Sequence, residues 1–326
     1  MTLASVDDTF TVLVEPLRRE LTAHCYRMLG SISEAEDLVQ ETYLRAWRAL
    51  HGFEGRSSVR TWMYTIATNT CLTALEKSSR RPLPTGLGQP ASDPGATLQT
   101  DHEMSWLEPI PDAVVWGREQ PEPGAAVVSR ESVRLAFVAA LQHLTAQQRA
   151  VVILCDVLAW RASEAAEALG ISVASVNSSL QRARAHLGKV APGDTPSAQP
   201  DDERSRALFD AYVAAFEAYD VDRIVSLLRA DAVWEMPPFT GWFSGPDAIR
   251  TLIEANCPAQ AAGDIRLVPV RANGQAAFAV YMRDVDGVHR AFQIQHLAIE
   301  RDEVAHVVAF FDLALFERFG LPAELD

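Results

Sequence analysis

The sequence lacks the marks of an exported or membrane-inserted chain. None of its segments holds about 18 uninterrupted apolar residues, and its first residues, "MTLASVDDTFTVLVEPLRREL", do not pair a basic region with an apolar stretch. Cysteine is scarce, with no C-x-x-C pair and no histidine pair at zinc spacing, and occurs at Cys25, Cys71, Cys155 and Cys257. We therefore expect a cytoplasmic protein without a signal peptide or membrane association, with buried free thiols and with neither metal nor cofactor.

Negative charge exceeds positive charge, but the excess is confined to parts of the chain. The formal net charge is −14 over the 326 residues. By segment it is 0 over residues 1–81, −5 over 82–130, +2 over 131–191 and −11 over 192–326. The acidity therefore belongs to the second and fourth segments, and the first and third remain open to nucleic-acid binding.

Apolar periodicity divides the first two thirds of the chain into two helical parts and a linker. Residues 8–81 predict three helices, with Ser33 and Ser58 as N-caps. Residues 82–128 are rich in proline, glycine and acidic residues, which predicts a mostly irregular linker. Helical periodicity returns over residues 129–191.

The last part of the chain, residues 203–326, has a mixed pattern. Two helices precede a strand at "AVWEM", and a further helix begins within "SGPDAIRTLIEAN". Asn273-Gly274 and Asp286-Gly287 each separate segments of β type and so predict hairpin turns. We expect an α+β domain with a curved antiparallel sheet.

A helix-turn-helix pattern lies near the end of the second helical part. A short helix over 164–169, a turn at Gly170 and a helix capped by Ser172 fit this motif, whose second helix reads bases in the major groove. The apolar face of that helix consists of Val176, Leu180, Ala183 and Leu187. An ordinary helical hairpin has the same local pattern, so the motif alone leaves both interpretations open.

Longer stretches resemble the extracytoplasmic-function group of bacterial RNA polymerase sigma factors. "LTAQQRAVVILCDVLAWRASEAAEALGISVASVNSSLQRARAHL" resembles their region four, and "SEAEDLVQETYLRAWRAL" with "SSVRTWMYTIATNTCLTALEKSSRR" resembles their region two. The motifs occur in the family's order with a linker between them. The resemblance implies two all-α sigma domains, a three-helix region two over 8–81 and a helix-turn-helix region four over 129–191. It also implies a non-enzymatic partner of core polymerase that directs promoter-specific initiation.

The resemblance assigns candidate contacts position by position. The helix that would dock on the β′ clamp of a polymerase core, whose β subunit is a further expected partner, carries Asp37, Gln40, Glu41 and Leu44. The minus-ten promoter element would be held by Arg60, Trp62, Tyr64, Asn69, Lys77, Arg80 and Arg81. The minus-thirty-five element would be read by Ser175, Asn177, Ser178, Gln181, Arg182 and Arg184. A solvated charged face is the alternative for the polymerase set, and a core position is the alternative for Trp62.

Two details of the sequence depart from this assignment or extend it. Arg161 stands where the family commonly places serine, and Ala165 and Ala168 stand where larger aliphatic residues are usual, so we expect slack packing under the recognition helix. The linker segment "WLEPIPD" resembles a motif of the sigma subgroup with an extra C-terminal domain. Trp106 and Ile110 are its predicted anchors, and docking on polymerase or on the extra domain both remain open.

Residues 203–326 resemble the SnoaL-like branch of the nuclear-transport-factor-two-like fold, a cone of curved sheet wrapped by helices. The resemblance implies a fused domain that modulates the sigma regions in cis, with a small-molecule pocket or a catalytic site as alternatives. Candidate pocket residues are Tyr212, Trp234, Met236, Trp242, Phe243, Met282, His296, Phe310 and Asp312. For most of them a place in the core is the stronger interpretation, because aromatic and methionine side chains on the inner face of a closed sheet usually belong to the core. Catalysis is disfavoured, because no carboxylate stands beside a histidine within an apolar strand.

Two other classes of protein share parts of this pattern. One is a SnoaL-type enzyme with a degenerate DNA-binding half, which substitution of Asp312 or His296 in a turnover assay would reveal. The other is a dimeric repressor that binds a palindromic duplex without polymerase. A mobility-shift assay with and without core enzyme distinguishes the repressor from a sigma factor.

Overall fold

The chain folds into two compact units. The computed structural model describes residues 10–77, 80–117, 130–190 and 203–325. The helical unit comprises Met1–Arg81 and Leu107–Gly193, and the sheet unit comprises Pro82–Trp106 and Asp194–Asp326. The stretch expected as a single linker is thus divided, since its first 25 residues fold with the C-terminal domain.

The first half of the helical unit contains three long helices, α2 (Arg18–Leu29), α3 (Ile32–Ala49) and α4 (Val59–Leu75), preceded by the 3-10 helix η1 (Glu15–Leu17) and with η2 (Leu50–Gly52) after α3. Ser58 caps α4 as predicted, because its side chain accepts a hydrogen bond from the Thr61 amide at 3.0 Å. The predicted cap at Ser33 is wrong. Gly30, at φ +75°, ends α2, and α3 begins directly afterwards with Ser31 as its cap.

The second half contains shorter elements and then the helix-turn-helix. In order these are α5 (Asp112–Trp116), η4 (Arg130–Val133), α6 (Leu135–Leu141), α7 (Ala146–Val152), the π-helix η5 (Ile153–Val157), α8 (Ala162–Leu169) and α9 (Val173–Val190). Gly170 ends α8 in the left-handed conformation, and the Ser172 hydroxyl accepts from the Ser175 amide at 3.1 Å, so the predicted turn and cap are confirmed.

The sheet unit is built on one sheet with strand order β2-β1-β6-β5-β4-β3, and β7 pairs with β5. Its strands are β1 (Leu228–Glu235), β2 (Trp242–Ser244), β3 (Ile265–Ala272), β4 (Gln275–Arg283), β5 (His289–Glu300), β6 (Glu303–Phe310) and β7 (Glu324–Leu325). Both predicted hairpins are present, between β3 and β4 and between β4 and β5. The sheet is mixed and not wholly antiparallel, because β1 pairs with β6 in parallel.

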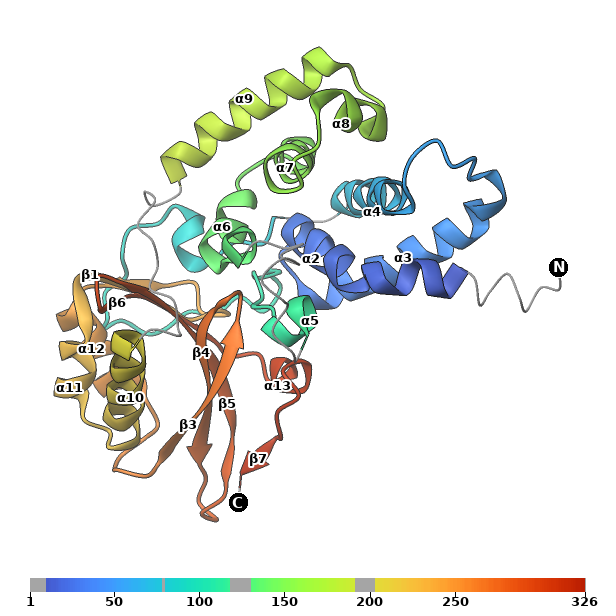
Figure 1. Cartoon of the computed structure of the whole chain (residues 1–326). Coiled ribbons are helices and arrows are strands. Elements are labelled where there is room, and N and C mark those ends of the chain that lie inside the picture. The colour runs from blue at the N-terminus through green and yellow to red at the C-terminus, as the bar shows by residue number, and fades with distance from the viewer. Residues whose placement is uncertain (1–9, 78–79, 118–129, 191–202, 326) are drawn as a thin grey trace. The chain divides into compact units, whose positions relative to one another are not determined.

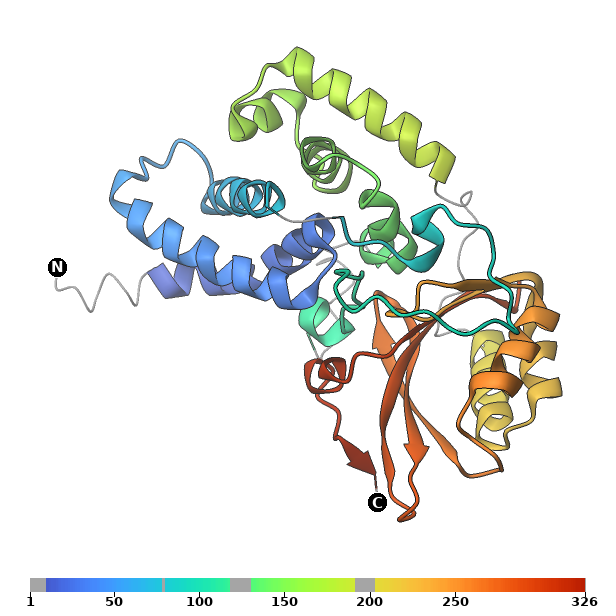
Figure 2. The ribbon, with the colours of Figure 1, turned by 180° about the vertical axis from the view of Figure 1, so that it is seen from behind.

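Helices cover one face of this sheet and enclose the core with it (Figures 1 and 2). They are α10 (Glu203–Glu217), α11 (Val221–Ser226) and α12 (Pro246–Asn256), while the short α13 (Ala314–Arg318) follows β6 and η3 (Pro84–Leu87) lies in the linker. Tyr212 and Ile249 from the helices are buried against Trp234 and Phe278 from the strands. Among the helices of the described residues, none is both long enough and apolar enough to cross a membrane.

Candidate nucleic-acid interface and pocket

Helix α9 presents a polar and cationic face to solvent. The six residues predicted to read the minus-thirty-five element are all exposed. On the opposite side, Val176 is buried with Val151, Leu154 and Ala165, so the helix is held against α7, η5 and α8 by its apolar face. One cation on the outer face is engaged. Arg184 Nε lies 3.0 Å from Asp156 Oδ2, and this pairing raises the pKa of the guanidinium.

Helix α4 places its predicted DNA contacts in more enclosed surroundings. Tyr64 is fully buried, and its hydroxyl lies 3.2 Å from Glu20 Oε2. Burial raises the pKa of Tyr64 above its usual value. Arg60 Nε donates to the same carboxylate at 2.9 Å, and its guanidinium stacks on the Tyr64 ring. The half-buried ring of Trp62 packs on Phe53, with ring centroids 4.7 Å apart.

The C-terminal end of α4 and the residues that follow contact other parts of the helical unit. Asn69 Nδ2 donates to the Ala168 carbonyl oxygen in α8 at 3.1 Å. Arg81 is buried in an ion pair of 2.6 Å with Glu34. Arg80 Nη1 lies 3.4 Å from His143, whereas Lys77 is exposed. The predicted minus-ten residues are therefore not presented on one free surface.

Two buried arginines join the two halves of the helical unit. Arg27 of α2 donates from Nε to the Ser132 carbonyl oxygen at 3.0 Å and from Nη2 to the Ser132 hydroxyl at 2.7 Å. Arg149 of α7 donates to the Met28 carbonyl oxygen at the end of α2 and to Gln142 Oε1. Burial lowers the pKa of each guanidinium to about 10. Both remain cationic near neutral pH, and each donates to a backbone oxygen in the other half of the unit.

Helix α3 carries an exposed stripe with apolar members. Asp37 and Gln40 are exposed, Leu44 is 51% exposed and Trp47 is 47% exposed. These positions recur at helical spacing on the outer side of α3, opposite the buried Val39 and Ala46. Glu41 forms an ion pair of 2.7 Å with Arg45.

The linker segment "WLEPIPD" docks mainly on the turn between α2 and α3. Leu107 and Ile110 are fully buried. The Glu108 carboxylate accepts from the Ile32 amide at 2.9 Å and from the Ser31 hydroxyl at 3.0 Å, and the Glu108 carbonyl accepts from Tyr26. Burial raises the pKa of Glu108. Within the helical unit, region two itself is thus the docking surface of this segment.

Residues 82–106, called the docked segment below, bind the sheet unit through backbone and side-chain hydrogen bonds. The Ser92 amide donates to the Trp242 carbonyl at 2.7 Å, and the Trp242 indole donates to the Gln89 carbonyl at 3.0 Å. Thr100 forms an isolated β-bridge with Phe239. The Thr85 amide donates at 2.7 Å to Glu235, a buried carboxylate that also lies 2.6 Å from His306 Nε2.

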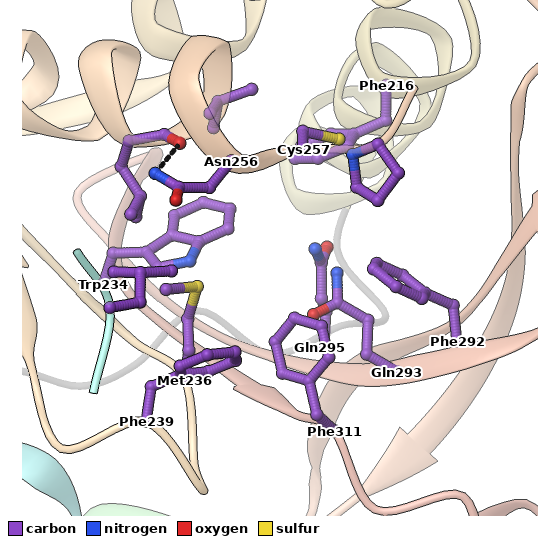
Figure 3. A pocket seen from close by; sticks show the side chains of 14 residues that line it. Phe216, Trp234, Met236, Phe239, Asn256, Cys257, Phe292, Gln293, Gln295 and Phe311 are labelled. Atoms are coloured by element: carbon purple, nitrogen blue, oxygen red, sulfur yellow. Dashed lines mark hydrogen bonds between the residues drawn. The ribbon is translucent and has the colours of Figure 1, made fainter. Parts of the chain in front are cut away.

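A cavity of about 320 Å³ lies between the sheet and helix α12 (Figure 3). Of the residues predicted to line a pocket, Trp234 and Met236 do so. Tyr212, Trp242, Phe243, Met282, His296 and Phe310 are not among its lining residues, and neither is Asp312, which is exposed. The lining residues absent from the prediction are Leu98, Phe216, Phe239, Leu252, Ile253, Asn256, Cys257, Pro258, Phe292, Gln293, Gln295 and Phe311.

Two glutamines supply polar groups inside this mostly apolar cavity. Gln293 and Gln295 alternate with Ile294 and His296 along β5 and therefore share the inner face of the sheet. Opposite β4 the register shifts between Val280 and Tyr281, and this bulge turns Phe292 to the same side as Gln293. A pair of amides two residues apart in the apolar stretch "FQIQHLAI" was the sequence signal for this site.

The cavity wall carries no acid–base pair among the described residues. Its one titratable side chain is Cys257, and burial raises the pKa of that thiol. His296 lies on the other face of β5, where burial, with a smaller effect of His306, lowers its pKa to about 3. The geometry thus provides a binding cavity without a general base at its wall.

Comparisons with known proteins agree with this division of the chain. Residues 13–81 match the Sigma-70 region 2 family, residues 134–187 the Sigma-70 region 4 family and residues 209–314 the SnoaL-like domain family. The chain is 57% identical over 318 residues to the ECF RNA polymerase sigma factor SigG of Mycobacterium tuberculosis, covering 97% of this chain and 85% of that protein. It is 32% identical over 240 residues to the ECF RNA polymerase sigma factor SigJ of the same organism, covering 73% of this chain and 67% of that protein. The crystal structure of SigJ matches with a TM-score of 0.62 at 24% identity, over 94% of this chain and 98% of that one.

Proposed function

Because the chain belongs to the extracytoplasmic-function family of RNA polymerase sigma factors, we propose that α9 and α4 are its two promoter-reading helices. As a sigma factor it binds core RNA polymerase and promoter DNA and directs the initiation of transcription, which it does in the cytoplasm. The observation that supports the role of α9 best is its exposed face of amide, hydroxyl and guanidinium groups on a helix-turn-helix with a buried apolar core.

The stripe on α3 is the proposed docking site for the β′ clamp of the polymerase. Exposed leucine and tryptophan beside acidic and amide groups suit a protein partner, because apolar side chains on a surface gain free energy when a partner covers them. The acidic residues of the stripe disfavour DNA as the partner of this face.

The helical unit as described is a closed form of this sigma factor. Asn69 of α4 is engaged by the backbone of α8, and Arg80 and Arg81 are engaged by His143 and Glu34. We propose that binding to core polymerase separates α4 from α8 and so breaks the contacts of Asn69 and Arg80 with the second half of the helical unit, while Arg81 stays paired with Glu34. Residues 131–191 carry a net charge of only +2, which gives weak electrostatic attraction to DNA phosphates. This fits the model, since two DNA-reading helices held together by polymerase bind DNA more tightly than either helix alone.

The C-terminal domain is proposed to regulate the sigma regions in cis without catalysing a reaction. Its docked segment connects directly to the end of region two at Arg81 and to "WLEPIPD" at Leu107. The cavity offers no carboxylate or histidine among its described lining residues, which is why we favour binding over turnover.

A reconstituted transcription assay tests these proposals together. Core polymerase with the full chain should initiate from a promoter selected from a random DNA library, and the Gln181→Ala/Arg182→Ala variant should lose most of that activity. Stable binding to the same duplex without core polymerase would contradict the two-helix model. Removal of residues 192–326 should change promoter output, and an unchanged output across a range of salt concentrations would contradict regulation in cis.

A further inference from the structure

The cavity of the sheet unit contains two buried polar atoms that lack partners. Gln295 is 1% exposed and Gln293 is 7% exposed. Tyr212 donates to Gln295 Oε1 at 3.0 Å, but among the described residues neither Gln295 Nε2 nor Gln293 Oε1 has a hydrogen-bond partner. A buried polar atom without a partner costs about 1–3 kcal/mol. Two glutamines of the cavity wall thus bury one donor, Gln295 Nε2, and one acceptor, Gln293 Oε1, without partners among the described residues.

The remaining described wall is uncharged and mostly apolar, and aromatic rings lie among its aliphatic residues. Phe239 and Phe292 each meet the Phe311 ring edge to face, with centroids 5.4 and 5.2 Å away, and Phe216 lies roughly parallel to Trp234. Figure 3 shows the amide ends of Gln293 and Gln295 directed into the space between Trp234 and Phe292. Such walls favour a flat ring system, and the absence of a charged group among the described lining residues disfavours an ion.

The size of the cavity also points to an organic ligand. Its volume of about 320 Å³ is near the lower end of the range for small-molecule sites. One water occupies about 30 Å³ and requires two to four polar partners, so water would fill this largely apolar space with few hydrogen bonds. The two glutamines lie two residues apart on the same face of β5, so their amide ends reach one ring system.

One wall of the cavity comes from the docked segment. Leu98 lines the cavity, and the residues that directly follow it are fixed to the loop between β1 and β2. The Thr240 amide donates to the Gln99 carbonyl at 2.9 Å, and the Asp101 amide donates to the Pro238 carbonyl at 2.9 Å. A ligand that contacts Leu98 is bound more tightly when the segment is docked. By reciprocity, such a ligand favours the docked state to the same extent.

We propose that the cavity binds a small, flat, uncharged molecule with neighbouring carbonyl and hydroxyl groups, and that this ligand fastens residues 82–106 to the sheet unit. The carbonyl accepts from Gln295 Nε2 and the hydroxyl donates to Gln293 Oε1. The inference rests on the proposed regulation in cis, and the small molecule is the signal to which that regulation would respond. Ligand binding would hold the first part of the linker away from the sigma regions that it connects.

The first experiment measures binding to the full chain. The probe is 3-hydroxyflavone, a neutral fluorescent ring system with adjacent hydroxyl and carbonyl groups, and flavone lacks only the hydroxyl. We expect saturable binding of 3-hydroxyflavone, about tenfold weaker in Gln295→Leu and in Gln293→Leu. Flavone should lose affinity in Gln295→Leu, which removes the donor to its carbonyl, but not in Gln293→Leu. Gln260→Leu, the same change at an exposed position, should leave the affinities for 3-hydroxyflavone and for flavone unchanged.

The second experiment measures coupling by hydrogen exchange of the full chain. Saturating 3-hydroxyflavone should slow exchange of the Ser92, Asp101 and Thr240 amides several-fold, and Leu98→Ala should reduce this protection while binding persists. Failure of both probes to bind, or equal binding in every glutamine variant, would overturn the ligand assignment. Binding without added protection of these amides would overturn the coupling. Unchanged transcription with intact binding and protection would instead contradict regulation in cis.

Discussion

Helices α4 and α9 carry the two predicted sets of promoter contacts, yet they present them in opposite ways. The outer face of α9 is exposed, and Arg184 alone among its six predicted residues has a described ion pair, with Asp156. On α4 and the residues after it, Tyr64 and Arg81 are buried and Asn69 is bonded to α8. In the proposed function, the predicted contacts of α9 are therefore accessible to DNA, whereas several of those on α4 are engaged within the helical unit.

The contrast follows from what each helix packs against. Helix α9 uses one apolar face, so its other face stays free. Helix α4 packs against α2 and α3 and also meets α7 and α8, which leaves it little free circumference. Its release therefore depends on the contacts between the two halves of the helical unit.

The largest effect is expected from the arginine that ties these halves together. Arg149→Met removes the guanidinium donor from the Met28 and Leu141 carbonyl oxygens, although Leu141 keeps the Leu144 amide, and should lower the free energy of unfolding of the helical unit by about 3 kcal/mol. Hydrogen exchange resolved by segment measures this, and faster exchange in α4 should accompany it. Arg48→Met, an exposed change on α3, is the control. Equal protection in both variants would show that Arg149 does not hold the closed form.

A pH change should affect both units through one buried histidine in each. Burial lowers the pKa of His24 and of His296 from 6.5 to about 3. As pH falls from 7 to 5 the unfolded chain binds protons that the folded chain does not, so stability present above pH 6.5 is lost. The loss is about 2 kcal/mol per histidine at pH 5. Urea unfolding followed by hydrogen exchange should show it. The loss of stability between pH 7 and pH 5 should be smaller in the helical unit of His24→Gln and in the sheet unit of His296→Gln. It should be unchanged in His51→Gln.

Within α9, the contrast between free and engaged cations can be tested directly. Arg182→Ala should weaken promoter binding by holoenzyme about tenfold, the cost of one base contact. Arg184→Ala should weaken promoter binding less than Arg182→Ala does, because the Arg184 guanidinium is already paired with Asp156. Asp156→Asn should free that guanidinium and tighten binding. Mobility shifts at fixed salt measure the affinity of the holoenzyme for the promoter. A greater loss of affinity in Arg184→Ala than in Arg182→Ala would contradict the assignment of Arg182 as the free, base-contacting cation.

The smallest effect concerns the hydrogen bond from Asn69 of α4 to the backbone of α8. Asn69→Ala removes the donor to the Ala168 carbonyl and should weaken that contact by about 1 kcal/mol. Exchange of the α8 amides should rise several-fold, with no such rise in Thr73→Ala, an exposed change one turn later on α4. Identical exchange in Asn69→Ala and the unmodified chain would mean that α8 is held by other contacts.

Local patterns predicted the turn and the cap of the helix-turn-helix well, because Gly170 and Ser172 each act through neighbours within a few residues. The hairpins at Asn273-Gly274 and Asp286-Gly287 were predictable for the same reason. The cap at Ser33 was predicted two residues too late, since either serine fits the pattern and only the turn at Gly30 selects Ser31.

The cavity was harder to predict because its wall combines distant segments. Leu98, Phe216, Asn256 and Gln295 come from the docked segment, a helix, the end of a second helix and a strand. The parallel pairing of β1 with β6 likewise joins strands far apart in sequence. Alternation along β5 placed Gln293 and Gln295 on one face, but only the fold shows that this face borders a cavity.

The docked segment is also a reserve of chain length in the connection between the two sigma regions. Its 25 residues, if released as a flexible coil, would span about 25–30 Å on average and about 80 Å when fully extended. While the segment is bound to the sheet unit, that length is withdrawn from the connection between Arg81 and Leu107. In the proposed mechanism, release of the segment would therefore change the effective concentration of one DNA-reading helix near the other, and with it the spacing between promoter elements that the protein tolerates.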